Sequence, residues 1–495
     1  MKKTISLFSI CVIFFSATPF LTNPKLVSNF VSGGNNYVDN TVPKVTEKKD
    51  STIQLWKAAV AKVKITPEHA KGSWMFGNAT QTKPSTGVAH DIFAVALAIE
   101  DYKGTKLVIV TYDLQGIPRT LRQSLVKRCE AAYKLAPASI LLNASHTHSG
   151  PEVRLNGING DDCEAYIKDK VAAEAYGRKL EEKTFKLIGE VLRNLAPAKL
   201  DYFHARAGFA MSRRLPTENG CDFGPNSNEP VDHSVPVLRV TSPDGRQLRA
   251  LLFGYACHPT ALVNSTMISP DYVGYARDYI EEAHPGTIAL FMQGCAGDQN
   301  PYPRHTPEFV KYHGRSLANA VEAALLTIPV PVNGTLGVAF SEVALEYAPL
   351  PSREELQNRK NNSDDKWERG HAEWVLGLMD HNQVPVSYPC PVQVVRFGND
   401  LALAAIGGEP VVDYSFRLKH ELAYPNVWVA GYSNDIFGYI GSSRVLKEGG
   451  YEGGGFIVYG RTNPNAWAAS TEDRIVSKIL ELDNLLKRSG DTVGH

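Results

Sequence analysis

The chain has 495 residues, of which 43% are hydrophobic and 21% are charged, proportions that are ordinary for a globular protein. Lysine plus arginine equals aspartate plus glutamate at 52 each, so the formal net charge is zero. A chain without net charge has no general attraction to nucleic acid or to an anionic membrane, and no nucleic-acid partner is expected. Local motifs must therefore indicate the function.

The N-terminus has the pattern of a secretory signal peptide, which we place at residues 1–22. A basic start, Met1-Lys2-Lys3, is followed by an apolar run over 5–15 that is short for a membrane span. An uncleaved anchor is the alternative. The polar segment 23–50 predicts a flexible leader. We therefore expect export to the periplasm or secretion, with no membrane span after the signal is removed.

Six cysteines remain after the signal peptide, an even number that permits disulfides in an exported protein without fixing how they pair. No Cys-x-x-Cys arrangement occurs, which argues against a zinc site built from thiolates. The six are Cys129, Cys163, Cys221, Cys257, Cys295 and Cys390.

Strand and helix patterns alternate along the rest of the chain. The first part predicts a strand at 106–112, a helix at 120–135, a strand at 139–142, a long helix at 162–194, a strand at 200–205, a hairpin of 235–240 with 249–255, a helix at 272–282, a strand at 287–292 and a helix at 307–326. The second part predicts strands at 335–347, a polar helical insertion at 352–380, strands at 392–397 and 401–406, a helix at 411–420, a strand at 427–430 and a helix at 470–487. This order predicts one α/β domain over 51–490, with a mixed β-sheet core and helices packed on its faces.

Two histidines follow the apolar strand that ends at Leu142. His146 and His148 are two residues apart, so on extended backbone both side chains would point to the same side. Gly150-Pro151 then ends any regular element. The pattern is typical of a site that holds a metal or moves a proton, and an ordinary surface loop is the alternative.

Further polar side chains follow other predicted strands, where sites of α/β folds lie. His258 follows 251–256, Glu409 follows 401–408, and Tyr439 follows 434–438. Each has a structural alternative: a core histidine, a carboxylate that caps the next helix, and a packed aromatic ring. Asp271 opens a helix and is explained by capping, while Asp113 either orients a ligand or caps a turn.

From about Ala58 to Arg461 the sequence resembles the neutral ceramidase family of secreted zinc amidases. The motif at 146–151, His-Thr-His-Ser-Gly-Pro, is similar to the hallmark of that family. The other matching motifs are Cys257-His258-Pro259-Thr260, Ser269-Pro270-Asp271, the loop 293–301, Gly408-Glu409-Pro410, and the tyrosines Tyr439 and Tyr451, which are twelve residues apart as in the family.

The resemblance implies one Zn²⁺ per chain, bound by His146, His258, Glu409 and Tyr439 with one position open for water. It implies that His148 acts as an acid/base partner. An arginine at Arg213, with Arg214 as the other possibility, and Tyr451 would donate to the negative oxygen that develops on the substrate.

Two departures from the family pattern stand out. Asn300 occupies the position of a serine proposed as catalytic, and an asparagine side chain donates hydrogen bonds but cannot act as a nucleophile. A metal-activated water needs no such serine. The chain also ends soon after Tyr459, so no C-terminal immunoglobulin-like domain is expected.

These features predict a zinc-dependent hydrolase that cleaves the amide bond of an N-acyl, ceramide-like substrate. One alternative is a zinc hydrolase of an ester, lactone or glycoside in a polar substrate, which the two departures favour. The other alternative is a binding protein that kept the fold without catalysis.

Overall fold

The computed structural model describes residues 56–76, 83–155, 169–218, 220–262 and 265–491. The predicted signal peptide, the leader, the first part of the helix predicted from 162 and Cys163 lie outside the described residues. The domain boundary at 51–490 stays a prediction. In the described residues no helix is long and apolar enough to cross a membrane.

The core is built on two β-sheets. The larger one has nine strands in the order β14-β12-β11-β8-β1-β4-β5-β6, with β16 paired to β8. The pairs β5–β6 and β12–β14 are parallel and the other pairs are antiparallel, so the sheet is mixed. Its strands are β1 (Trp56–Lys64), β4 (Phe93–Glu100), β5 (Lys106–Tyr112), β6 (Ile140–Ala144), β8 (Ala196–Arg206), β11 (Ser234–Thr241), β12 (Leu248–Tyr255), β14 (Ile288–Gln293) and β16 (Val330–Pro331).

The smaller sheet has four strands in the order β17-β18-β19-β21, with β19 and β21 parallel. Its strands are β17 (Leu336–Glu346), β18 (Ser387–Phe397), β19 (Leu401–Ile406) and β21 (Asn426–Ala430). A continuous apolar cluster joins the two sheets, for example through Leu97 and Leu290 of the larger sheet and Leu403 of the smaller one. The two sheets therefore pack face to face.

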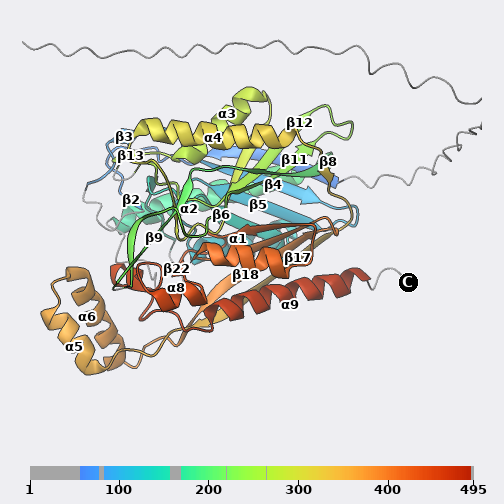
Figure 1. The fold of residues 1–495 in the computed structure, drawn as a ribbon. Coiled ribbons are helices and arrows are strands. Elements are labelled where there is room, and N and C mark those ends of the chain that lie inside the picture. The colour runs from blue at the N-terminus through green and yellow to red at the C-terminus, as the bar shows by residue number, and fades with distance from the viewer. Residues whose placement is uncertain (1–55, 77–82, 156–168, 219, 263–264, 492–495) are drawn as a thin grey trace, which may run out of the picture. The chain divides into compact units, whose positions relative to one another are not determined.

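Helices cover the outer faces of both sheets, above and below in the view of Figure 1. The larger sheet is covered by α1 (Arg119–Tyr133), α2 (Lys170–Arg193), α3 (Tyr272–Ala283) and α4 (Pro307–Leu325), and the smaller by α7 (Val412–Glu421) and α9 (Thr471–Asp491). Apolar side chains are buried between the two sheets and between each sheet and its helices. At about 25 cal/mol per Å² of buried apolar surface, this burial is the main contribution to the stability of the fold.

Short elements complete the chain. They are β2 (Met75–Phe76), β3 (Gly87–Val88), β7 (Gly150–Pro151), β9 (Ala210–Thr217), β10 (Gly220–Asn226), β13 (Met267–Ile268), β15 (Gln299–Pro301), β20 (Glu409–Pro410), β22 (Tyr439–Ile440), α5 (Arg353–Asn362), α6 (Lys366–Asp380), α8 (Ser443–Glu448) and the 3-10 turns η1 (Pro137–Ser139) and η2 (Gly455–Tyr459). The helices α5 and α6 extend away from the sheets in Figure 1.

The two end strands of the larger sheet approach each other at their carboxyl ends. Gln293, the last residue of β14, donates its backbone N–H to Asn143 Oδ1 of β6 at 2.9 Å. Asn143 Nδ2 donates in turn to the carbonyl of Gly431 at 2.8 Å, just beyond β21 of the smaller sheet. A single buried asparagine thus joins three strand ends, and the loops that follow those strands meet at one place.

The predicted α/β class, with a mixed sheet and helices on its faces, is confirmed. The second sheet and the strands β1 and β4 were not predicted. β4 reads Phe-Ala-Val-Ala-Leu-Ala-Ile-Glu and is buried over almost its whole length, and periodicity alone does not distinguish such an alanine-containing run from a buried helix segment. The insertion predicted as one helical stretch at 352–380 is two helices, because Ser363 and Asp365 end one helix and cap the next.

The five cysteines in the described residues, Cys129, Cys221, Cys257, Cys295 and Cys390, are free thiols. The four that are buried have a raised pKa because burial disfavours the thiolate. Among these five, no disulfide contributes to stability.

Candidate metal centre

The four predicted metal ligands meet beyond the carboxyl ends of strands from both sheets. His146 follows β6 and His258 follows β12. Glu409 follows β19 and pairs in parallel register with Tyr439, which lies beyond β21. Strands from both sheets therefore deliver the four side chains to one end of the fold, as expected of an α/β site.

The side chains approach to within contact distance. Glu409 Oε2 lies 3.0 Å from His146 Nε2 and 3.3 Å from His258 Nε2. Tyr439 Oη lies 3.4 Å from His258 Nε2, and His148 Nε2 lies 3.2 Å from His146 Nε2. All four predicted ligands and His148 form one cluster, and the three histidines present ligand nitrogens within 4.8 Å of one another.

Hydrogen bonds to backbone carbonyls fix the tautomers of His146 and His258. His146 Nδ1 donates to the carbonyl of Gln115 at 2.5 Å, and His258 Nδ1 donates to the carbonyl of Ala296 at 2.7 Å. Because a neutral imidazole carries one proton, both Nε2 atoms are left with a lone pair facing the cluster. Carbonyl partners of this kind fix metal-binding histidines in the required tautomer.

The charge states of His258 and Glu409 also fit a bound cation. Burial and the Arg213 guanidinium lower the pKa of His258 to about 3, so its ring is neutral at pH 7. Burial would raise the pKa of Glu409, and only positive charge at His146 and His258 holds that pKa well below its ordinary value, so with both rings neutral the ionised carboxylate needs another positive charge beside it. Glu409 Oε2 receives no hydrogen bond from any described residue. Lone pairs facing an unpaired carboxylate oxygen fit a bound divalent cation.

The prediction that His146 and His148 lie on extended backbone, with both side chains on one side of a strand, is wrong. His146 is not on extended backbone: its φ is 69°, in the left-handed region. Its backbone N–H donates to Leu114 at 2.9 Å, which turns the chain away from the β6 direction. A loop conformation held by the neighbouring strand, rather than strand alternation, brings His146 and His148 together.

The candidate arginine and asparagine lie beside the cluster. The guanidinium carbon of Arg213 is 5.2 Å from the ring centre of Tyr439, and its Nη1 donates to Asn300 Oδ1 at 3.4 Å. Arg214 points elsewhere, donating to Glu452 Oε2 at 2.9 Å and to Glu448 Oε2 at 3.0 Å. Of the two arginines that the sequence left open, Arg213 is the one that reaches the centre.

Tyr451 lies next to Tyr439, with ring centres 5.1 Å apart. Beyond it are Phe223 of the β9–β10 hairpin at 6.1 Å and Tyr459 at 6.0 Å, and Trp367 of α6 stands 5.8 Å from Tyr459. We call these four side chains (Phe223, Tyr451, Tyr459 and Trp367) the aromatic wall. It extends from the cluster to the surface, where Phe223 is 54% exposed.

Two other candidates are structural. Asp271 accepts hydrogen bonds from the backbone N–H of Tyr272 at 2.7 Å and of Leu262 at 2.9 Å, so it caps α3 and holds the loop after His258. Asp113 forms a buried ion pair with Arg277 and accepts from the backbone of Phe93. Neither side chain belongs to the cluster.

Three residues that sequence reasoning did not assign support the cluster. Asn143 joins the strand ends. The ring of Tyr432 packs 4.6 Å from that of His146 on backbone with φ 50°. Glu452 accepts from Arg213 Nε at 2.7 Å and also binds Arg214. Asn143 and Glu452 stand close to matched motifs, but only their distant partners reveal what they do.

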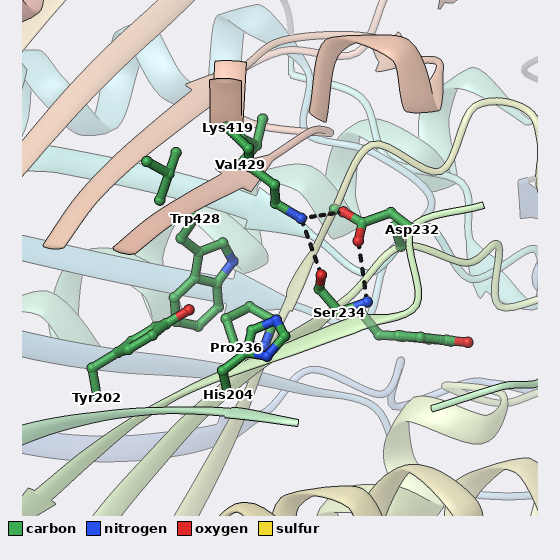
Figure 2. Close-up of a pocket in the computed structure, with 12 residues that line it drawn as sticks. Tyr202, His204, Asp232, Ser234, Pro236, Lys419, Trp428 and Val429 are labelled. Atoms are coloured by element: carbon green, nitrogen blue, oxygen red, sulfur yellow. Dashed lines mark hydrogen bonds and ion pairs between the residues drawn. The ribbon is translucent and has the colours of Figure 1, made fainter. Parts of the chain in front are cut away.

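A small pocket is lined by Gly294 of the loop 293–301 and by Lys419 and Asp232, and no residue of the cluster lines it (Figure 2). Lys419 of α7 points at Asp232 and Ser234, and its Nζ lies 2.6 Å from Asp232 Oδ2. The backbone N–H of Asp232 donates to Gln299 Oε1 at 2.9 Å. This ion pair therefore braces the helix after Glu409 against the loop that carries Asn300.

Asp298 in that loop makes stability depend on pH. Its carboxylate accepts from the backbone N–H of Val412 at 2.9 Å, and burial raises its pKa to about 7. The unfolded chain loses this proton near pH ~4 while the folded chain keeps it, so stability falls as pH rises between the two values. Asp298→Asn keeps the acceptor oxygen and removes the titration.

Urea unfolding of the wild type and of Asp298→Asn between pH 4 and pH 8 tests this. As pH rises to 7, the free energy of unfolding of the variant should increase by up to roughly 4 kcal/mol relative to that of the wild type. Above pH 7 this difference should stay constant. A difference that does not change with pH would show that Asp298 is ionised in the folded protein.

The fold and the cluster together define a class: an α/β protein of two packed sheets with a buried His-Glu-Tyr centre suited to a divalent cation at its strand ends. The family model for neutral/alkaline non-lysosomal ceramidase, N-terminal, matches residues 56–306, just over half of the chain. The chain belongs to this ceramidase family.

Individual relatives agree with the family model. The neutral ceramidase of Pseudomonas aeruginosa is 26% identical over 268 residues, which are 50% of this chain and 37% of that protein. The neutral ceramidase of Drosophila melanogaster is 23% identical over 50% of this chain and 36% of its own length. Neutral ceramidase B of Dictyostelium discoideum is 26% identical over 57% and 40%. The matches thus span well under half the length of these relatives.

Solved structures show the same fold. The crystal structure of the Pseudomonas aeruginosa neutral ceramidase superposes with a TM-score of 0.67 at 19% identity, covering 88% of this chain and 75% of that one. A structure described as ceramidase complexed with C2 superposes with a TM-score of 0.66 at 18% identity, covering 88% and 76%. The shared fold extends beyond the segment matched by the family model.

Proposed function

We propose that the protein is a zinc-dependent hydrolase that cleaves the amide bond of an N-acyl, ceramide-like substrate, and that it acts in sphingolipid metabolism. The observation that carries this proposal is the unpaired Glu409 carboxylate oxygen facing the lone-pair nitrogens of His146 and His258. Family membership supports the choice of substrate. The predicted signal peptide at 1–22 supports action outside the cytoplasm.

His146, His258, Glu409 and Tyr439 would hold the ion. A divalent cation bound there supplies a Lewis acid that activates water near neutral pH and polarises a carbonyl. Burial raises the pKa of Tyr439 well above its ordinary value against the opposing effect of Arg213. The phenol would thus become a ligand only with a cation beside it, which stabilises the deprotonated oxygen.

The remaining residues bind and move protons. Burial lowers the pKa of His148 well below its ordinary value, so its imidazole is neutral at pH 7 and would hold a transferred proton only transiently. Arg213 stays charged, because Tyr439 and Glu452 raise its pKa against the effect of burial. Arg213 and Tyr451 would stabilise negative charge on the substrate oxygen.

The aromatic wall supports a substrate with an apolar portion. Phe223 is exposed, yet it packs against Arg213 and Tyr451 at the edge of the centre. Exposed aromatic side chains next to a site are typical of ligand binding. An acyl chain or sphingoid chain that leaves the centre along this wall would cover Phe223.

Phe223→Ala tests the contribution of the wall. Loss of the apolar contact should raise KM about tenfold with little change in kcat, since the ring touches a part of the substrate that does not react. Tyr312→Ala, which removes a 64% exposed aromatic ring on α4, is the matched control and should change neither constant. A fall in kcat at constant KM would argue against a binding role for Phe223.

The deciding experiment is an activity panel on the purified, zinc-loaded protein. We expect turnover of a short-chain ceramide and loss of that turnover after chelation, with recovery on adding zinc. The panel includes simple esters, lactones and aryl glycosides. Absence of turnover with every N-acyl sphingoid base would reject the ceramide proposal.

A second candidate is hydrolysis of an ester, lactone or glycoside in a polar substrate. The observation that favours it is Asn300, whose buried amide stands where a serine is expected by resemblance. Turnover confined to that part of the panel would support it. Bound metal with no turnover of any compound would favour a binding protein.

A further inference from the structure

Two buried nitrogen donors beside the candidate metal centre have no hydrogen-bond partner in the described part of the chain. They are Asn300 Nδ2 and Arg213 Nη2. Asn300 is 1% exposed and Arg213 is 3% exposed, so bulk water does not satisfy them. Native structures rarely leave buried donors unpaired, and two adjacent ones indicate a group that is brought by a ligand.

The orientation of the Asn300 amide is fixed by its neighbours. Its Oδ1 accepts from Arg213 Nη1 at 3.4 Å and from Thr260 Oγ1 at 3.3 Å. A guanidinium has no acceptor, so the amide oxygen must face it. A flipped amide would set N–H groups against Arg213, and therefore Nδ2 is the atom turned away from both neighbours.

Sheet pairing and an ion pair hold the two side chains in place. Strand β15 carries Asn300 and pairs with β9, where Asn300 faces Met211, while Arg213 follows two residues later. Glu452 binds Arg213 Nε at 2.7 Å, which leaves Nη2 free to act.

Two arginines and one glutamate carry the buried charge next to these donors. Arg213 and Arg214 share the buried Glu452, while Glu448, the other partner of Arg214, is 40% exposed. Arg213, Arg214 and Glu452 together carry one excess positive charge, which the Glu409 carboxylate of the cluster offsets when no cation is bound there. With a divalent cation bound to the cluster, a negatively charged acceptor would be favoured over a neutral one.

We propose that Asn300 Nδ2 and Arg213 Nη2 form a two-donor site for the oxygens of an acyl group, and that this site binds carboxylates. The assignment rests on the proposed amide hydrolysis, which releases a carboxylic acid with two acceptor oxygens for the two donors. In this proposal Asn300 donates a hydrogen bond to the substrate, at the position where the family resemblance places a serine hydroxyl.

The test is binding of butyrate to the full-length purified protein, measured by isothermal titration calorimetry. Asn300→Ala should weaken binding roughly tenfold or more, because it removes one donor to a charged acceptor. Asn300→Asp, which replaces the donor with a negative charge, should weaken it further, and Asn300→Ser should retain part of the affinity. Asn399→Asp is the matched control, since Asn399 also accepts from an arginine, Arg396 at 3.0 Å, but on the surface.

The outcomes separate this inference from the proposed function. Butyrate affinity that is the same in the wild type and the folded Asn300 variants would overturn the two-donor site, even if the protein hydrolyses amides. Failure of the wild type to bind butyrate would overturn it as well. Binding that depends on Asn300 in a protein that hydrolyses no amide would support the site and count against the proposed function. Circular dichroism confirms that each variant is folded, and Asn300→Ser serves if Asn300→Asp is not.

Discussion

Glu409→Ala and His146→Ala are expected to purify with far less than one zinc per chain and to lose at least a thousandfold in kcat/KM. Each change removes a group that faces the centre directly, and Glu409 contributes the negative charge that compensates a cation. Loss of a partner that only orients a ligand already costs about 10–100-fold in affinity or activity, so loss of a ligand costs more. Metal content by elemental analysis and activity are measured on the same samples.

Two further variants sharpen this test. Glu448→Ala removes a carboxylate that is 40% exposed, and it should keep the metal and the activity. His148→Ala decides the role of a histidine whose Nε2 lies 3.2 Å from that of His146. Retained zinc with reduced activity would support proton transfer by His148, whereas lost zinc would make it a ligand. Full zinc content in both Glu409→Ala and His146→Ala would contradict the proposed centre.

Glu452→Gln is expected to lower the free energy of unfolding by about 3–5 kcal/mol, among the largest effects of any single change in the chain. Glu452 is the shared partner of two arginines that are both almost fully buried, through contacts of 2.7 Å and 2.9 Å. Glutamine has nearly the same shape but no charge, so the two guanidinium groups would remain buried and repel each other. Breaking a buried pair in this way is strongly destabilising.

The comparison for Glu452→Gln is Glu448→Gln, which changes the same residue type against the same arginine. Glu448 lies 3.0 Å from Arg214 but is exposed, and exposed pairs contribute about 0–1 kcal/mol. Urea denaturation of both variants and the wild type at pH 7 measures the difference. Equal, small losses would mean that water reaches the two arginines and that Glu452 does not hold them.

The local patterns alone identified most of the regular elements. The strand predicted at 106–112 is β5 with the same limits, and the predicted hairpin 235–255 is the β11–β12 pair. Hydrophobic periodicity and turn residues act over a few positions, so they can be read without the fold. Such patterns missed β4, because periodicity alone does not distinguish its alanine-containing apolar run from a buried helix segment.

The sequence by itself determined the α/β class, and the resemblance of its short motifs predicted the four ligands. The spacing of those ligands along the chain carried no geometric information, because His146 and Tyr439 are separated by most of the domain. Their membership of one centre was only implied by resemblance until the structure brought them together.

Only the tertiary structure decided how the centre is built. Asn143 contacts residues 150 and 288 positions away, and Glu452 contacts arginines 239 and 238 positions away. The left-handed backbone at His146, the free Nε2 atoms and the unpaired donors of Arg213 and Asn300 also depend on distant partners. Such contacts form when two sheets and their loops pack, and no pattern of neighbouring residues encodes which distant group will stand opposite.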